Sequence, residues 1–231
     1  MEKITDGVWL LDGNPRHAYN VYLLHDVLVD AGSRFAERRI LRQVSGGRVR
    51  AHVVTHGHPD HQGASHAVCS RLSIPLWCGD GDADAIERGR LDELITDSAI
   101  ARWQVKHWGG PAHPVARRLR EGDEVGDFTV LATPGHTPGS ISLWREADRT
   151  LLVGDTLNRR PMVLGGGLGE PPADFCIDPD RNRAAIRRLA ALEPATVCFG
   201  HGQPLRDPAT FSAFANGLST RVNRRTAARV R

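Results

Sequence analysis

The chain has 231 residues, of which 40% are hydrophobic and 25% are charged, with a formal net charge of +3 at pH 7. These values are ordinary for a soluble globular protein, and the length supports a core that needs no disulfide staples. The small positive excess is spread over scattered arginines, which excludes a dedicated nucleic-acid-binding stripe.

The four cysteines include no CxxC pair, and we interpret them as buried free thiols in a reducing compartment. The N-terminal residues lack the basic start, apolar run and cleavage site of a signal peptide. No run of about 18 apolar residues is present, so no membrane span is expected. We therefore expect a cytoplasmic protein without membrane or nucleic-acid partners; its oligomeric state is left open.

The first third of the chain alternates strand and helix patterns. The stretches "GVWLL", "NVYLLH" and "DVLVDAG" predict β-strands. A helix is predicted over residues 35–44, with Ser33 as a candidate N-cap. The stretch "RVRAHVVTH" then predicts a strand, and "GASHAVCSRL" predicts a helix.

The remainder repeats this arrangement. "IPLWCG" is a predicted strand, and residues 80–114 are less regular, with helical stretches. Strands are predicted in "FTVLATPGH", "SISLWRE", "TLLVGDT" and "ATVCFGHG". Asp178 and Pro179 begin a predicted helix, and a closing helix leads into a basic tail. No linker divides the chain, so we expect a single domain over residues 1–231, an α/β sandwich with helices outside packed sheets.

The stretch "VVTHGHPDHQG" places three imidazoles and a carboxylate at the end of a predicted strand. In an extended chain, residues two apart point to the same side, so His56 and His58 can converge on one ion. Pro59 holds His58 in an extended conformation. Beyond the proline the chain turns, and Asp60 and His61 can face a second position.

Three more polar residues follow predicted strands: His136 in "TPGHT", Asp155 in "VGDT" and His201 in "FGHG". Each is flanked by glycine, which allows close approach, and we expect Gly63 likewise to keep the first motif free of obstruction. Each of the three alone has an ordinary structural explanation. Together with the first motif they supply enough ligands for two ions with an open, water-bearing position. Imidazole and carboxylate suit Zn²⁺, and also Fe or Mn.

The order HxHxDH, GHT, GD and GH resembles the metallo-β-lactamase superfamily, and with "VDAG" it extends from residue 30 to residue 201. The resemblance implies a four-layer αββα sandwich with two divalent metal ions, most often Zn, at one edge. By matching motif, it assigns His56, His58 and His136 to the first ion. It assigns Asp60, His61 and His201 to the second ion, and Asp155 to a position that bridges both. Asp30 is either a residue that orients a ligating histidine or a simple turn residue.

The chain differs from several subfamilies of this superfamily, and these differences narrow the range of expected activities. The β-lactamase branches lack this ligand set, and the flavodiiron branch replaces the histidine corresponding to His58 with glutamate. Glyoxalase II adds a C-terminal helical domain, for which about 30 residues after His201 leave little room. The tRNA-processing nucleases carry a basic arm that is not visible here. The resemblance therefore favours a compact lactonase, thioesterase or glyoxalase II-like hydrolase.

The sequence predicts a dinuclear metallohydrolase acting on a small ester, thioester or lactone. Two cations lower the pKa of a shared water, so that hydroxide forms near neutral pH and attacks a polarised carbonyl. Asp60 is the predicted catalytic residue, which orients the hydroxide and relays its proton. The alternatives are a mononuclear iron persulfide dioxygenase, a phosphodiesterase of the same fold and a non-catalytic metal-stabilised module. Trp103 and Trp108 are candidates for a lid over the substrate.

Overall fold

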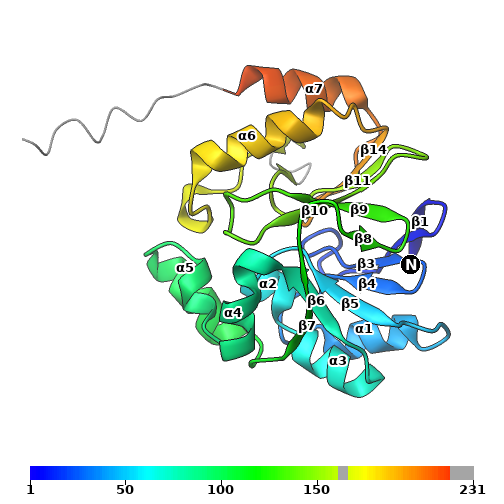
Figure 1. Cartoon of the computed structure of the whole chain (residues 1–231), viewed down its shortest axis with the longest axis vertical. Helices are drawn as coiled ribbons and strands as arrows, with labels where there is room; N and C mark the ends of the chain where they lie inside the picture. The colour runs from blue at the N-terminus through cyan, green and yellow to red at the C-terminus, as the bar shows by residue number, and fades with distance from the viewer. Residues whose placement is uncertain (161–165, 219–231) are drawn as a thin grey trace, which may run out of the picture.

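The computed structural model describes residues 1–160 and 166–218. Two β-sheets pack face to face, and helices cover the outer face of each, which confirms the predicted αββα sandwich (Figure 1). The basic tail predicted from the sequence lies outside the described residues. In the part of the chain that is described, no helix combines the length and the apolar character needed to cross a membrane.

The N-terminal sheet has strand order β1-β2-β3-β4-β5-β6-β7. Its first four strands pair antiparallel, and the pairs from β4 to β7 are parallel. The strands are β1 (Glu2–Thr5), β2 (Val8–Leu10), β3 (Tyr22–Leu24), β4 (Val27–Val29), β5 (Ala51–Val54), β6 (Leu76–Gly79) and β7 (Val115–Leu119).

The C-terminal sheet has strand order β14-β11-β10-β9-β8, in which only the β11–β14 pair is parallel. A separate two-stranded ribbon pairs β12 with β13. These strands are β8 (Glu124–Val125), β9 (Phe128–Ala132), β10 (Ile141–Arg145), β11 (Thr150–Leu152), β12 (Asn158–Arg159), β13 (Leu168–Gly169) and β14 (Thr196–Cys198).

The helices divide between the two outer faces. Helices α6 and α7 cover the C-terminal sheet, and α1, α3 and α4 cover the N-terminal sheet (Figure 1). The helices are α1 (Glu37–Val44), α2 (Pro59–Gln62), α3 (Ser65–Leu72), α4 (Asp80–Arg88), η1 (Leu91–Leu94), α5 (Ala99–Trp108), η3 (Ala173–Phe175), α6 (Pro179–Ala190) and α7 (Pro208–Gly217).

Strand β4 explains why the layers stack in this order. Val27 and Val29 point into the core between the sheets, whereas Leu28 points into the core beneath α1 and α3. A strand that is buried on both faces carries a continuous apolar run, because alternate side chains enter different layers. The stretch "VLV" is such a run, and it leads directly to Asp30 at the edge where the site lies.

Two predicted helix starts had different outcomes. The Asp178 carboxylate accepts a hydrogen bond from the backbone N–H of Arg181 at 3.0 Å, which confirms the predicted cap of α6. The prediction that Ser33 caps the first helix is wrong, because α1 begins at Glu37 and its cap residue makes no side-chain cap bond. Phe35 is 69% exposed and precedes the helix, so residues 33–36 form a turn instead.

Candidate metal centre

The HxHxDH stretch lies where β5 ends and the one-turn helix α2 begins. His58 has an extended conformation, with φ −70° and ψ 152°, and Pro59 occupies the first helical position. His58 therefore has the predicted extended backbone, whereas His56 lies in a bend after β5, and Asp60 and His61 belong to the helical turn that follows.

His56, His58 and His136 form the first triad, with ligand atoms that all lie within 4.8 Å of one another. The Nε2 atoms of His56 and His136 are 3.1 Å apart. The Nε2 of His58 is 2.9 Å from the carbonyl oxygen of Leu94 and donates to it, which leaves Nδ1 to face the other two rings. All three rings are buried, so their positions are set by packing rather than by solvent.

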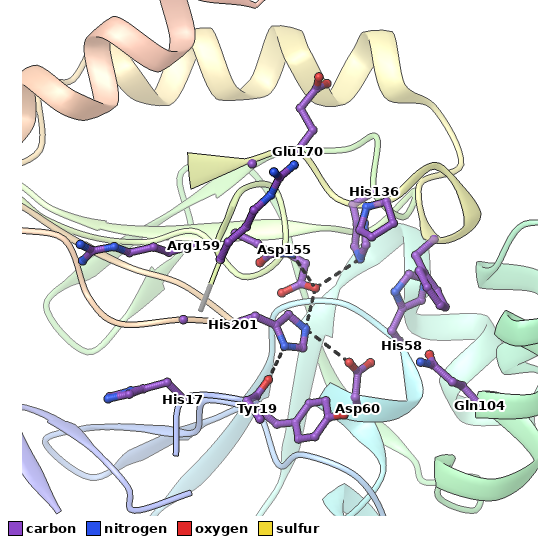
Figure 2. Close-up of a pocket in the computed structure, with 17 residues that line it drawn as sticks. His17, Tyr19, His58, Asp60, Gln104, His136, Asp155, Arg159, Glu170 and His201 are labelled. Atoms are coloured by element: carbon purple, nitrogen blue, oxygen red, sulfur yellow. Dashed lines mark hydrogen bonds and ion pairs between the residues drawn. The ribbon is translucent and has the colours of Figure 1, made fainter. Parts of the chain in front are cut away.

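Asp60, His61 and His201 form the second triad, and Asp155 lies between the two triads. The His201 Nε2 is 2.9 Å from Asp155 Oδ2 and 3.3 Å from Asp60 Oδ2. The His61 Nε2 is 3.4 Å from both Asp155 Oδ1 and His201 Nε2. Asp155 Oδ2 is also 3.9 Å from the His136 Nε2 of the first triad. Figure 2 shows Asp60, His136, Asp155 and His201 converging from both halves of the chain.

These separations match the spacing of ligands around a metal ion. Two ligand atoms about 2.05 Å from a tetrahedral Zn²⁺ are about 3.3 Å from each other. The separations within the two triads that were given above, 3.1, 3.3 and 3.4 Å, are close to that value. The structure thus brings six of the seven predicted ligands into two triads and groups the seventh, Asp155, with His56 and His61, so the chain carries a candidate His/Asp site for divalent metal ions.

The first triad is electrostatically ready to bind a cation. Burial, together with neighbouring imidazoles, holds the pKa of His56 and of His136 well below the usual range of histidine. Both rings are therefore neutral at physiological pH, which is the form that coordinates a metal ion.

In the second triad, nearby carboxylates raise the pKa of the histidines instead of burial lowering it. Burial opposes protonation of His61, but Asp155, Asp30 and Asp60 outweigh it and raise the pKa of His61 to about 10. The pKa of His201 is also raised well above its usual range, because Asp155 and Asp60 outweigh burial. These carboxylates need compensating positive charge. A metal ion that supplies it must displace the imidazole protons, so metal binding strengthens as pH rises.

Asp30 holds the second triad in place. Its backbone lies in the left-handed region with φ 61°, and its buried carboxylate accepts from the Thr55 backbone N–H at 2.8 Å and hydroxyl at 2.9 Å. Asp30 Oδ2 is also 2.9 Å from His61 Nδ1. The bond to Nδ1 directs the other ring nitrogen toward His201 and Asp155. Of the two interpretations of Asp30, the structure favours the one in which it orients a histidine.

At two glycines of the motifs, Gly63 and Gly200, neighbouring atoms lie too close to leave room for a side chain. A side chain at Gly200 would overlap the Asp155 carboxylate and the His61 ring. The explanation offered for Gly63 is wrong, because Gly63 lies between α2 and α3 and not at the metal ligands. A Cβ there would meet backbone atoms of Arg34, Trp108 and Pro59, so Gly63 allows three chain segments to pack together.

Asp82 is an important residue that the sequence pattern did not reveal. It lies in the first turn of α4, is fully buried, and accepts hydrogen bonds from the backbone N–H groups of Gly57 at 2.8 Å and Gly139 at 2.6 Å. The Thr137 hydroxyl also donates to it at 2.6 Å. Asp82 thus ties the HxHxDH loop to the loop of His136. Among several acids in "DGDAD", only the tertiary structure distinguishes it.

The triads open into a cavity of about 580 Å³. Tyr19, Gln104, Asn158 and Phe175 are among its lining residues, together with Asp60, Asp155, His58, His136 and His201. Neither lid candidate belongs to this lining. Trp103 is 51% exposed and packs against His107 and Trp108, so α5 contributes Gln104 to the wall rather than a tryptophan.

Comparison with known proteins agrees with this geometry. The model of the metallo-beta-lactamase superfamily matches residues 15–201. The probable metallo-hydrolase YflN of Bacillus subtilis (strain 168) is 30% identical over 220 residues, which are 86% of this chain and 81% of that protein. The acyl-coenzyme A thioesterase MBLAC2 of Gallus gallus is 29% identical over 174 residues, 68% of this chain and 59% of that protein.

A solved structure shares the fold at similar identity. The crystal structure of TTHA1623 in a di-iron-bound form aligns with a TM-score of 0.61 and 26% identity, covering 86% of this chain and 88% of that chain. The residues matched by the family model include both triads and Asp155. The chain therefore belongs to the metallo-beta-lactamase superfamily of metallo-hydrolases.

Proposed function

We propose that the protein is a dinuclear metallohydrolase that cleaves a small thioester, ester or lactone. The observation that carries this proposal is the pair of triads joined by Asp155 at the base of a single cavity. The second triad is as complete as the first, which favours two ions over the mononuclear iron alternative. Zn²⁺ is the metal we expect, because imidazole and carboxylate are its ordinary ligands.

His56, His58 and His136 would hold one ion, Asp60, His61 and His201 the other, and Asp155 both. When bound, the pair of ions supplies a water of lowered pKa and polarises a carbonyl. Asp60 lines the cavity, and we propose that its carboxylate orients the attacking water there and relays its proton. Burial opposes ionisation of Asp60, but His61 and His201 outweigh it and lower the pKa of this carboxyl to about 2, so Asp60 is ionised and carries the negative charge of a metal ligand.

Tyr19 is a second candidate for direct contact with the substrate. It lines the cavity, and its ring centre is 5.5 Å from that of His201. Burial, with the charge of Asp60, raises the pKa of the Tyr19 hydroxyl, so the phenol keeps its proton. We propose that this hydroxyl donates a hydrogen bond to the carbonyl oxygen as negative charge develops there.

Among the candidate substrates, the thioester is favoured. The relative MBLAC2 carries the name of an acyl-coenzyme A thioesterase, and its similarity covers 68% of this chain. The cavity volume of about 580 Å³ is within the range of pockets for small molecules. Phe175 and Pro172 provide an apolar part of the wall against which an acyl group can pack.

The test combines metal analysis with a substrate panel. Protein purified without added metal should contain two ions per chain and hydrolyse members of a thioester, ester and lactone panel. A strong chelator should abolish this activity, and Zn²⁺ or Mn²⁺ should restore it. The His136→Ala variant should lose metal and turnover, whereas His66→Ala, which changes an imidazole that contacts His113 away from the cavity, should retain both.

Three results would contradict the proposal. Hydrolysis that survives complete metal removal would exclude the mechanism. A single iron per chain with oxygen uptake on a persulfide would establish the dioxygenase alternative instead. Metal-loaded protein that hydrolyses a generic phosphodiester but no carbonyl substrate would establish the phosphodiesterase.

A further inference from the structure

One wall of the cavity carries two consecutive arginines. The ribbon formed by β12 and β13 pairs Asn158 with Gly169 and Arg159 with Leu168. Arg159, Arg160, Gly169 and Glu170 from this ribbon and its ends line the same cavity as Asp60 and Asp155. The ribbon therefore contributes two arginines to the wall of the cavity that holds the candidate metal centre, and the Arg159 side chain extends away from Asp155 (Figure 2).

The acidic residue of this wall is already engaged. The carboxylate of Glu170 accepts from Arg183 of α6, at 2.6 Å for Nε to Oε1 and 3.4 Å for Nη2 to Oε2. Figure 2 shows the Glu170 side chain pointing toward a helix and away from Asp155 and His201. Glu170 is therefore directed to Arg183 and does not neutralise the arginines of the wall.

Arg159 is held in place without a carboxylate. Its Nη1 donates to the carbonyl oxygen of Pro204 at 3.0 Å, and its Nε donates to that of Gly166 at 3.3 Å. Carbonyl oxygens satisfy these donors but carry no formal charge, so the positive charge of Arg159 is not neutralised. These bonds also attach the ribbon to the loop that follows His201.

Arg160 differs from Arg159 in being exposed, and its side chain, like that of Arg159, forms no ion pair with the described carboxylates. The segments outside residues 1–160 and 166–218 contain neither aspartate nor glutamate. No acidic side chain elsewhere in the sequence is thus available to neutralise it. A planar guanidinium with free donors binds carboxylate or phosphate through two parallel hydrogen bonds.

We propose that Arg160, assisted by the charge of Arg159, binds an anionic group of the substrate while the scissile carbonyl lies at the metal centre. This inference rests on the proposed function and names its substrate class: thioesters or esters that carry a carboxylate or phosphate. Two neighbouring arginines without an acidic partner also raise the local concentration of anions.

The experiment uses three thioesters with the same scissile group. One is neutral, one carries a carboxylate at the end of its acyl chain, and one carries a carboxylate on its thiol. The kcat/KM of each is measured for the parent protein and for Arg160→Ala, Arg160→Lys and Arg42→Ala. Arg42 is an exposed arginine on α1, so the last variant changes the net charge equally but leaves the cavity intact.

We expect the parent to prefer one of the two anionic thioesters over the neutral one. Arg160→Ala should lower kcat/KM for that substrate about 5- to 10-fold, mainly through KM, and leave the neutral thioester unchanged. Arg160→Lys should retain part of the preference, because it keeps the charge but loses the paired donors. Arg42→Ala should behave as the parent does.

A binding measurement provides a readout apart from turnover. Calorimetry with a thioether analogue that keeps the preferred carboxylate but lacks the carbonyl should give a Kd about 5- to 10-fold weaker for Arg160→Ala than for Arg42→Ala. Equal hydrolysis of all three thioesters, or an anion preference that survives Arg160→Ala, would overturn the inference. Failure to hydrolyse any of them would instead count against the proposed function.

Discussion

Asp82→Asn tests how the two ligand-bearing loops are held together. Oδ2 of Asp82 accepts from Gly57 at 2.8 Å and Thr137 at 2.6 Å, and Oδ1 accepts from Gly139 at 2.6 Å. An asparagine has one oxygen and one NH₂ group, so in either orientation a backbone N–H that is now satisfied would face a donor. The residue is fully buried, and water cannot replace the lost bond.

The expected cost follows from these contacts. A buried donor left without a partner costs about 1–3 kcal/mol, and a hydrogen bond to a charged acceptor contributes about 1.5–3 kcal/mol. Burial raises the pKa of Asp82, and asparagine removes that penalty of burying a charge. Because this gain offsets part of the loss, we expect the free energy of unfolding to fall by about 2 kcal/mol. Urea denaturation monitored by circular dichroism measures this change.

Asp80→Asn is the matched control on the same helix. Asp80 is half-exposed and pairs with Arg120 at 3.2 Å, and such surface pairs contribute less than about 1 kcal/mol. Because Gly57 lies between His56 and His58, Asp82→Asn should also weaken metal binding about tenfold in competition with a chelator. The reasoning would be refuted if Asp82→Asn matched Asp80→Asn in both measurements.

Three further predictions concern other parts of the molecule. Asp155→Asn removes the carboxylate between two cations expected to lie about 3.5–4 Å apart. Metal content should therefore fall toward one ion per chain, and kcat should drop steeply. A variant that retains two ions and normal turnover would refute the bridging role of Asp155. Burial lowers the pKa of His52 to about 4 from 6.5, so its contribution to stability is complete above pH 6.5 and is lost as pH falls toward 4. Between about pH 7 and pH 5 this loss is about 2 kcal/mol, and denaturation of His52→Gln should show a pH dependence weaker by that amount. Trp103→Ala should leave KM unchanged, because Trp103 is not among the residues that line the cavity, and a raised KM would restore the lid interpretation.

The candidate ligands were predictable because they cluster in short motifs that follow apolar strands, and His56, His58, His136, Asp155 and His201 are each beside a glycine. A spacing of two in an extended chain places His56 and His58 on one side, and in the structure both side chains belong to the first triad. The sandwich was predictable for a related reason: two blocks of strands, each followed by helices, leave two apolar faces that must pack together.

The remaining features depend on contacts that no local pattern contains. Asp82 differs from its acidic neighbours because it bonds to residues 25, 55 and 57 positions away. The start of α1 was misplaced because Ala36 extends the apolar stripe of Ile40 and Val44 toward the N-terminus, although the helix itself begins at Glu37 and Phe35 lies exposed before it. Arg160 looked like one of many scattered arginines, and only the fold places it on the wall of the cavity.

The position of His201 has a consequence for how the chain opens. His61 and His201 are 140 residues apart in the sequence, so an ion held by both is a reversible cross-link across most of the fold. By analogy with a disulfide, closing a loop of about 100 residues is associated with about 4–5 kcal/mol of stabilisation. His201 follows β14, the strand at the edge of its sheet, and beyond it lies α7. The second ion would thus link the C-terminal segment to the N-terminal half of the chain. Removal of this ion would let the C-terminal segment detach before the two sheets separate.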